Sequence, residues 1–291
     1  MSEHRESMSQ HREFHYRLPQ RIGGWRPGSH RGSSLGAGQE FVSHVRLYDR
    51  PDPRRLDLRA SLRNIQQEWL VRVNRQQASI PVHAVVDVSA SMSFGSQRSK
   101  LDVAAEFIEA LGQSTFRVGD ALGMLAFDSR ERTDLFVPAM VSRGMGETMA
   151  TLLRKSSAAA GDAAGLQDAI QHLAGRRGLV FLVSDFHWPL AGMHAALDCL
   201  VQSFVVPVVI WDAAEIRPPA HDGLAQLRDV ESGAQRTLWM RPRMREKWLE
   251  SAAARRTELN QLFASRAMRP FYVTGRFDGE AMSQYFFEVA A

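Results

Sequence analysis

Short apolar runs alternate with amphipathic stretches over the last two-thirds of the chain. Three of the runs lead into an acidic residue, at Asp87, Asp185 and Asp212, and each has the length of one buried strand. Between the runs, apolar residues recur at helical spacing, most clearly from Lys100 to Thr115. This alternation predicts an α/β, Rossmann-like fold with a central, mostly parallel sheet flanked by helices. The predicted strands cover residues 82–87, 121–127, 135–137, 179–184, 204–210 and 269–274, and the predicted helices cover residues 100–115, 146–155, 165–174, 190–201, 243–265 and 280–287.

The pattern divides the chain into three predicted parts. Residues 1–40 are dense in Gly, Ser and Arg, which favours a flexible arm over packed structure. Residues 41–77 are expected to form an irregular bridging segment that includes a short strand at 69–73. Residues 78–291 carry the α/β pattern and form the main domain, with a small β-hairpin predicted near 224–240.

Charge is unevenly distributed along the chain. The formal net charge is +4, yet the first 77 residues hold fourteen Arg and no Lys, and the rest has more acidic than basic residues. A basic N-terminal segment is typical of a surface for an acidic partner or a nucleic acid. It is also compatible with an Arg-rich segment that lies across its own acidic domain, and we favour this second interpretation.

Composition excludes several classes of protein. The single cysteine, Cys199, excludes an intramolecular disulfide and a Cys-based zinc site. No apolar run approaches the ~20 residues that a membrane-spanning helix needs. The N-terminus lacks the apolar stretch of a secretory signal. We therefore expect a soluble, cytoplasmic protein.

Candidate chemistry lies at the predicted carboxyl ends of the strands, where parallel α/β sheets bind ligands. Directly after the first buried strand, Asp87, Ser89 and Ser91 place one carboxylate and two hydroxyls at alternating positions. Asp185, at the end of another strand, offers a second carboxylate. Oxygen donors of this kind suit Mg²⁺ or Mn²⁺. A simpler alternative is that these side chains cap a helix and close a turn.

Seven short blocks in a fixed order carry a family resemblance: residues 28–33, 36–41, 52–57, 59–61, 86–92, 181–186 and 229–233. In these blocks the chain resembles the von Willebrand factor A domain, whose metal-ion-dependent adhesion site has the form DxSxS. More narrowly, it resembles the DUF58 family of bacterial proteins that accompany MoxR-type AAA+ ATPases. The resemblance implies a von Willebrand A-type fold and a non-enzymatic adaptor that works with such an ATPase on a client protein, in complex assembly or maturation. One branch of the family is linked to methanol dehydrogenase maturation, and the assignment to that branch stays open.

The resemblance also implies a metal site. Carried over residue by residue, the ligands of Mg²⁺ or Mn²⁺ would be Asp87, Ser89, Ser91 and Asp185. The chain departs from the family at the position of a fifth ligand, usually Thr, where Ala164 stands and has no side-chain oxygen. Asp162 is the possible substitute. The predicted site is therefore a degenerate one.

Arg54 and Arg55 are candidate partner-binding residues because arginine pairs well with carboxylates.

Three further interpretations stay open beside a metal-dependent adaptor. Partner binding could be independent of metal, or the basic arm could bind nucleic acid. A phosphate-ester hydrolase with Asp87 as nucleophile is the least favoured alternative. The chain has no Walker-type phosphate-binding loop, which argues against nucleotide hydrolysis.

Overall fold

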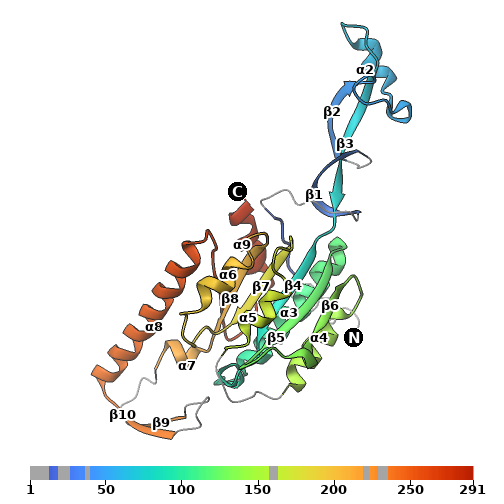
Figure 1. The fold of residues 1–291 in the computed structure, drawn as a ribbon. Helices are drawn as coiled ribbons and strands as arrows, with labels where there is room; N and C mark the ends of the chain where they lie inside the picture. The colour runs from blue at the N-terminus through green and yellow to red at the C-terminus, as the bar shows by residue number, and fades with distance from the viewer. Residues whose placement is uncertain are drawn as a thin grey trace, which may run out of the picture. The chain divides into compact units, whose positions relative to one another are not determined.

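The computed structural model describes residues 13–18, 27–36, 40–156, 163–218, 223–228 and 235–290 (Figure 1). The chain divides into two units. Unit 1 comprises Met1–Arg17 together with Pro81–Ala291, and unit 2 comprises Leu18–Ile80.

Unit 1 is built on a six-stranded sheet with the order β11-β8-β7-β4-β5-β6. Its strands are β4 (Pro81–Asp87), β5 (Ala121–Phe127), β6 (Val137–Met140), β7 (Leu179–Ser184), β8 (Phe204–Trp211) and β11 (Phe271–Thr274). All neighbours pair in parallel except β5 and β6, which are antiparallel. Numbered along the sheet's own strands, this is the doubly wound order 3-2-1-4-5-6, which reverses direction between β4 and β7. The carboxyl ends of β4 and β7 therefore lie side by side at the switch point.

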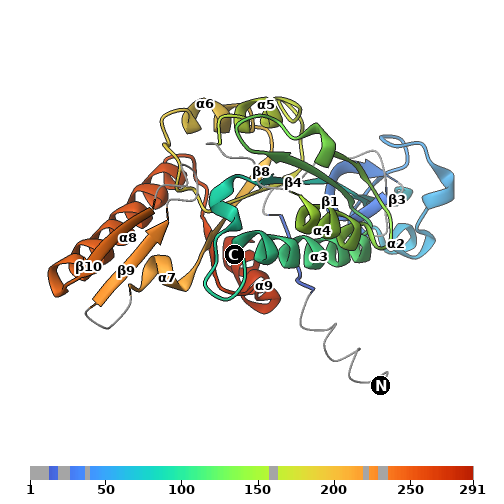
Figure 2. The same cartoon turned by 90° about the horizontal axis from the view of Figure 1, so that it is seen from below.

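Helices cover both faces of this sheet. They are α3 (Lys100–Val118), α4 (Met145–Lys155), α5 (Leu166–Gln171), α6 (Met193–Asp198), α7 (Ala213–Ile216), α8 (Pro242–Ala264) and α9 (Gly279–Ala290). One core joins apolar side chains of the central strands with those of α5, α6 and the end of α8. Helices α3, α4 and α9 lie on the opposite face (Figure 2). The predicted fold class, a mostly parallel sheet flanked by helices, is confirmed.

Residues 13–17 pack against the helices and the sheet of unit 1, to which they belong, although the sequence predicts a flexible arm there. Phe14 is 2% exposed and stacks against Phe107 of α3 and Phe286 of α9, with the edge of its ring against Phe181 of β7. The hydroxyl of Tyr16 donates a hydrogen bond of 2.5 Å to Asp120. Burial of these aromatic rings removes a large apolar area from water and fixes the segment in place.

Unit 2 contains a three-stranded antiparallel sheet with the order β1-β3-β2. Its elements are β1 (Pro27–Gly36), β2 (Glu40–Arg46), the 3₁₀ helix η1 (Pro53–Arg55), α2 (Leu58–Arg63) and β3 (Leu70–Ala78). Strand β1 is rich in Gly and Ser, a composition that predicts a loop, yet it forms an edge strand of this sheet. The pairing of β1 with β3 is irregular, with register shifts of the kind that glycine permits at sheet edges.

A two-stranded antiparallel sheet, β9 (Gly223–Arg228) with β10 (Gln235–Met240), lies where the sequence predicts a hairpin. Short 3₁₀ helices, η2 (Ala90–Ser93) and η3 (Thr133–Leu135), follow β4 and β5. Among the described residues, no helix is both long and apolar enough to cross a membrane.

Candidate functional site

Asp87 lies at the end of β4, fully buried at the switch point of the sheet. One of its oxygens, Oδ1, accepts a hydrogen bond from the backbone N–H of Ser89 at 2.9 Å. The other, Oδ2, accepts from the Ser184 hydroxyl at 2.6 Å and from the Trp188 indole N–H at 3.1 Å. The hydroxyl oxygens of Ser89 and Ser91 lie 3.2 Å apart. The DxSxS segment is therefore folded around its own aspartate at the edge of the sheet.

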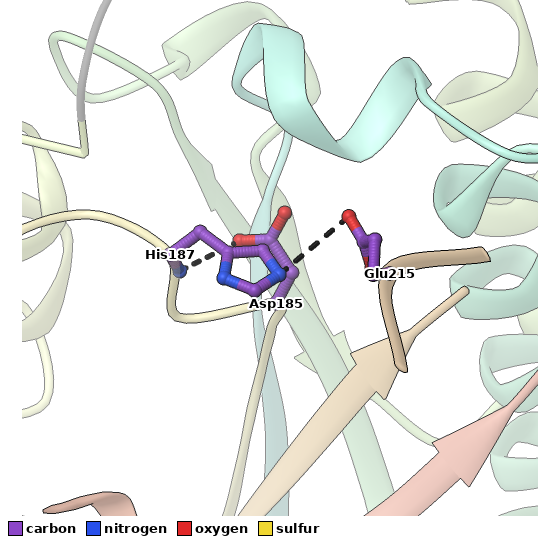
Figure 3. Close-up of side chains that lie close together, drawn as sticks. All are labelled: Asp185, His187 and Glu215. Atoms are coloured by element: carbon purple, nitrogen blue, oxygen red, sulfur yellow. Dashed lines mark hydrogen bonds and ion pairs between the residues drawn. The ribbon is translucent and has the colours of Figure 1, made fainter. Parts of the chain in front are cut away.

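Asp185, at the end of β7, takes part in a second cluster that includes a residue absent from the predicted site. The ammonium of Lys100, the first residue of α3, lies 2.6 Å from Asp185 Oδ2 and 2.5 Å from Glu215 Oε1 of α7. The backbone N–H of His187 donates to Asp185 Oδ1 at 3.1 Å, and His187 Nε2 lies 3.5 Å from Glu215 Oε1 (Figure 3). Lys100 is 2% exposed and Asp185 is 0% exposed, so the ion pair is almost completely dry.

The two clusters influence each other's ionisation. Burial, together with the nearby charge of Asp185, raises the pKa of Asp87 to about 6, although hydrogen bonds from Ser184 and Ser89 oppose the shift. Burial acts to raise the pKa of Asp185 as well, but the charges of Lys100 and His187 and the hydrogen bonds from these two residues together lower it. Burial acts to lower the pKa of Lys100, but Asp185 and Glu215 raise it. At neutral pH the Lys100–Asp185 pair is thus ionised on both sides.

A further set of hydrogen bonds ties the loop after β4 to the end of β8. Asp212 Oδ2 accepts from the backbone N–H and the hydroxyl of Ser96, at 3.0 and 3.1 Å. The backbone N–H of Asp212 donates to Glu215 Oε2 at 2.8 Å, which completes a capping box at the start of α7. Glu215 therefore accepts from Lys100 with one oxygen and holds α7 with the other.

The structure thus places the four carried-over residues, Asp87, Ser89, Ser91 and Asp185, at one edge of the sheet. At the fifth position, Ala164 lines a pocket of about 180 Å³ together with Trp188, whose indole donates to Asp87. Asp162, the possible substitute, lies outside the described residues.

The sequence contains a weak signal for the residue that the prediction missed. Only three of the 36 basic residues are lysines, and one of them is Lys100, at the first position of α3. A cation is disfavoured at a helix N-terminus because the helix dipole is positive there. An isolated lysine in an arginine-rich chain, at a position that disfavours cations, indicates a tertiary role. Nothing local indicates its partners.

The arrangement of donors does not fit a resident Mg²⁺ or Mn²⁺. All four oxygens of Asp87 and Asp185 already accept hydrogen bonds from protein groups, and Lys100 neutralises Asp185. Ligand atoms of Asp185, His187 and Glu215 lie within 4.8 Å of one another, but the ammonium of Lys100 bonds to two of these three residues. The metal site stays a prediction from the resemblance.

Arg54 and Arg55 belong to unit 2. They lie in η1, where Arg55 Nε is 3.2 Å from Asp52 Oδ2 and Arg54 is exposed. Arg55 is therefore engaged in a local ion pair, and Arg54 is the more accessible of the two.

The comparison with known proteins identifies the family. The family model described as "Protein of unknown function DUF58" matches residues 44–258, from β2 into α8. The chain belongs to the DUF58 family. Over 248 residues it is 29% identical to the uncharacterized proteins Mb1516 of Mycobacterium bovis and Rv1480 of Mycobacterium tuberculosis, an alignment that covers 83% of this chain and 76% of each relative.

Solved structures similar to this DUF58 protein include BatB from Bacteroides thetaiotaomicron. It is 17% identical with a TM-score of 0.45, and the match covers 73% of this chain and 99% of BatB. A von Willebrand factor type A protein from Catenulispora acidiphila is 12% identical with a TM-score of 0.38, over 75% of this chain and 43% of that one.

Proposed function

We propose that this DUF58 protein is a non-enzymatic protein-binding module that works with a MoxR-type AAA+ ATPase on a client protein. The ATPase and the client come from the family resemblance. The observation that carries the binding function is an exposed apolar surface on unit 2.

The proposed surface, which we call the α2 surface, takes in the exposed apolar residues on and next to α2 in the chain: Tyr48 after β2, Leu58 and Leu62 on α2, and Ile65 just after it. Their exposed fractions are 94%, 58%, 83% and 97%. Leu58 and Leu62 are one helical turn apart and so share a face of α2, which lies at one end of the unit 2 sheet (Figure 1). Exposed apolar side chains that gather on one surface typically mark a binding site for another protein, and the proposal takes these four residues as such a group.

Charged residues beside the α2 surface support the same proposal. Arg54 precedes α2 in the chain and is exposed, and Arg59 lies on α2 itself and is also exposed. Arginine is enriched in protein interfaces, where an apolar centre is surrounded by a polar rim. The predicted partner-binding role of Arg54 therefore fits its place beside an apolar surface.

The carboxyl edge of the six-stranded sheet is the second proposed contact. A pocket of about 430 Å³ lies beside it, lined by His187, Trp211 and Glu215 at the edge and by Trp248 and Arg255 of α8. Aromatic-lined pockets of this size accommodate an anchoring side chain of a partner.

The test is a calorimetric titration of the purified full chain with a MoxR-type ATPase from the same organism. We expect Leu62→Ser combined with Ile65→Ser to weaken binding by about tenfold or more, equivalent to ~1.4 kcal/mol. Val201→Ser is the matched control, because Val201 is an apolar residue of unit 1 that is 77% exposed. Undiminished binding by the double variant, or no binding of any MoxR-type ATPase by the wild type, would refute the proposal. The titration is repeated in EDTA, where we expect the same affinity, because the carboxyl edge does not fit a resident metal ion.

A further inference from the structure

We propose that the ammonium of Lys100 holds the carboxyl edge of the six-stranded sheet together in place of a divalent cation. The chain would thus supply from within the positive charge that an adhesion-type site takes from a metal ion. This inference concerns how the edge is assembled, and it stands whether or not the proposed partner is correct.

The geometry shows how much of the edge depends on this one side chain. Lys100 begins α3, Asp185 ends β7, and Glu215 lies in α7, and the lysine joins these three segments through bonds of 2.6 and 2.5 Å. Its ammonium also lies 5.7 Å from the centre of the Phe94 ring, a cation–π contact on the loop after β4. One buried cation therefore connects three segments that are distant in sequence, together with the loop just before α3.

The choice of lysine is informative because the chain otherwise uses arginine. Lys100, Lys155 and Lys247 are its only lysines, against 33 arginines. A guanidinium is a planar fork with five donors, whereas an ammonium is a compact point charge. Of the two cationic side chains, lysine is closer to a metal ion in size and in the distribution of its charge. The compact group fits a dry position between two carboxylates, where a fork would leave donors unpaired.

The same position excludes a metal ion from these carboxylates. Mg²⁺ binds oxygen ligands at ~2.0–2.1 Å, and the Lys100 nitrogen is only 2.6 Å from an Asp185 oxygen and 2.5 Å from a Glu215 oxygen. Two cations at one pair of oxygens repel each other in a site that water does not screen. Binding a metal here would require the Lys100 side chain to move away from both carboxylates. That side chain is only 2% exposed, so it is packed on nearly every side.

The inference predicts the consequence of removing the amine. Lys100→Met keeps the length and the apolar character of the stem but deletes the charge. Asp185 and Glu215 would then face each other without a counter-ion, beside His187. Carboxylate and imidazole groups in such a cluster are ligands for Mn²⁺. The variant should therefore gain a metal site that the wild type lacks.

The test is a titration of the full chain with Mn²⁺ alone, followed by the electron paramagnetic resonance signal of the free ion. The wild type should bind no Mn²⁺ at the edge, and Lys100→Met should bind one ion about tenfold or more tighter than any site of the wild type. Mn²⁺ should also raise the Tm of Lys100→Met while leaving the wild-type Tm unchanged. Lys155→Met is the matched control and should behave as the wild type, because Lys155 is exposed at the end of α4.

Two results would overturn the proposal. The first is stoichiometric binding of Mn²⁺ by the wild type that Ser89→Ala or Ser91→Ala abolishes. The second is a folded Lys100→Met that binds Mn²⁺ no better than Lys155→Met. The wild-type arm does not depend on Lys100→Met, so it tests the proposal even where that variant does not fold. The readout uses metal without a partner, so its failure is distinguishable from failure of the proposed ATPase interaction.

Discussion

Two aspartates, one in each unit, accept a hydrogen bond of the same length from a cationic side chain. Asp185 lies 2.6 Å from Lys100 in unit 1, and Asp57 lies 2.6 Å from Arg72 in unit 2. The exposed fractions differ: 0% and 2% in the first pair, 9% and 60% in the second. Water competes for the Arg72 pair and is excluded from the Lys100 pair. The distance between the charges therefore does not by itself determine how much an ion pair contributes to the free energy of unfolding.

The two pairs also differ in what they connect. Asp57 is the N-cap of α2, accepts from the backbone N–H of Ala60 at 3.0 Å, and lies 3.1 Å from His44 Nε2. That backbone bond, with those from Arg72 and His44, holds the pKa of Asp57 well below its usual range. Every one of these partners lies within 15 residues in the sequence. Lys100, in contrast, bonds to residues 85 and 115 positions away. The Arg72–Asp57 pair organises a local turn, and the Lys100–Asp185 pair joins distant segments of the core.

The largest expected effect comes from deleting the buried cation. Lys100→Met should reduce the free energy of unfolding by about 3–5 kcal/mol, because an uncompensated carboxylate stays buried. Urea unfolding in metal-free buffer measures this loss. Lys155→Met should change it by no more than ~1 kcal/mol, since Lys155 is a surface residue. Equal losses for the two lysines would show that burial does not distinguish them.

A smaller effect is expected from pH, again through burial. His83 of β4 is 8% exposed, and burial, aided by the charge of Arg176, lowers its pKa from 6.5 to about 4. The unfolded chain therefore binds this proton at a higher pH than the folded one. The stability that neutral His83 contributes is present above pH 6.5 and is lost progressively as pH falls from 6.5 to about 4.

This loss amounts to about 3 kcal/mol at 1.36 kcal/mol per pKa unit. Urea unfolding of the wild type and of His83→Gln at pH 7, 6, 5 and 4 measures this loss as the change in the difference between the two proteins. The difference is needed because Asp87, whose pKa burial raises, shifts stability in the opposite direction in both. A difference that is the same at pH 7 and at pH 4 would contradict the predicted protonation of His83.

The smallest effect is expected in unit 2. Arg72→Ala should change the free energy of unfolding of unit 2 by no more than ~1 kcal/mol, because Arg72 is 60% exposed. The loss should shrink further in high salt, which screens surface charges. Urea unfolding of Arg72→Ala and of the wild type, followed by circular dichroism at low and at high salt, measures this loss. A salt-insensitive loss as large as that of Lys100→Met would remove the distinction between the two pairs.

The positions of Asp87 and Asp185 follow from the sequence because apolar runs mark strands and parallel strands share a carboxyl edge. Other features depend on contacts that local sequence does not encode. The helical pattern indicates where α3 begins, but not that Lys100 meets carboxylates about a hundred residues away. Strand β1 has the composition of a loop, and its pairing with β3 makes it a strand. Phe14 and Tyr16 alternate with polar residues, a strand-like signal that short length and polar surroundings obscure.

The most direct test of the account is a double-mutant cycle of Lys100→Met with Asp185→Asn, measured by urea unfolding in metal-free buffer. Because the two charges neutralise each other in a dry site, we expect the effects of the two substitutions on the free energy of unfolding to be strongly coupled. The double variant should recover at least half of the stability that Lys100→Met loses, because the carboxylate left unpaired is gone. Losses that simply add, with the double variant less stable than either single one, would contradict the claim that Lys100 holds this edge by its charge.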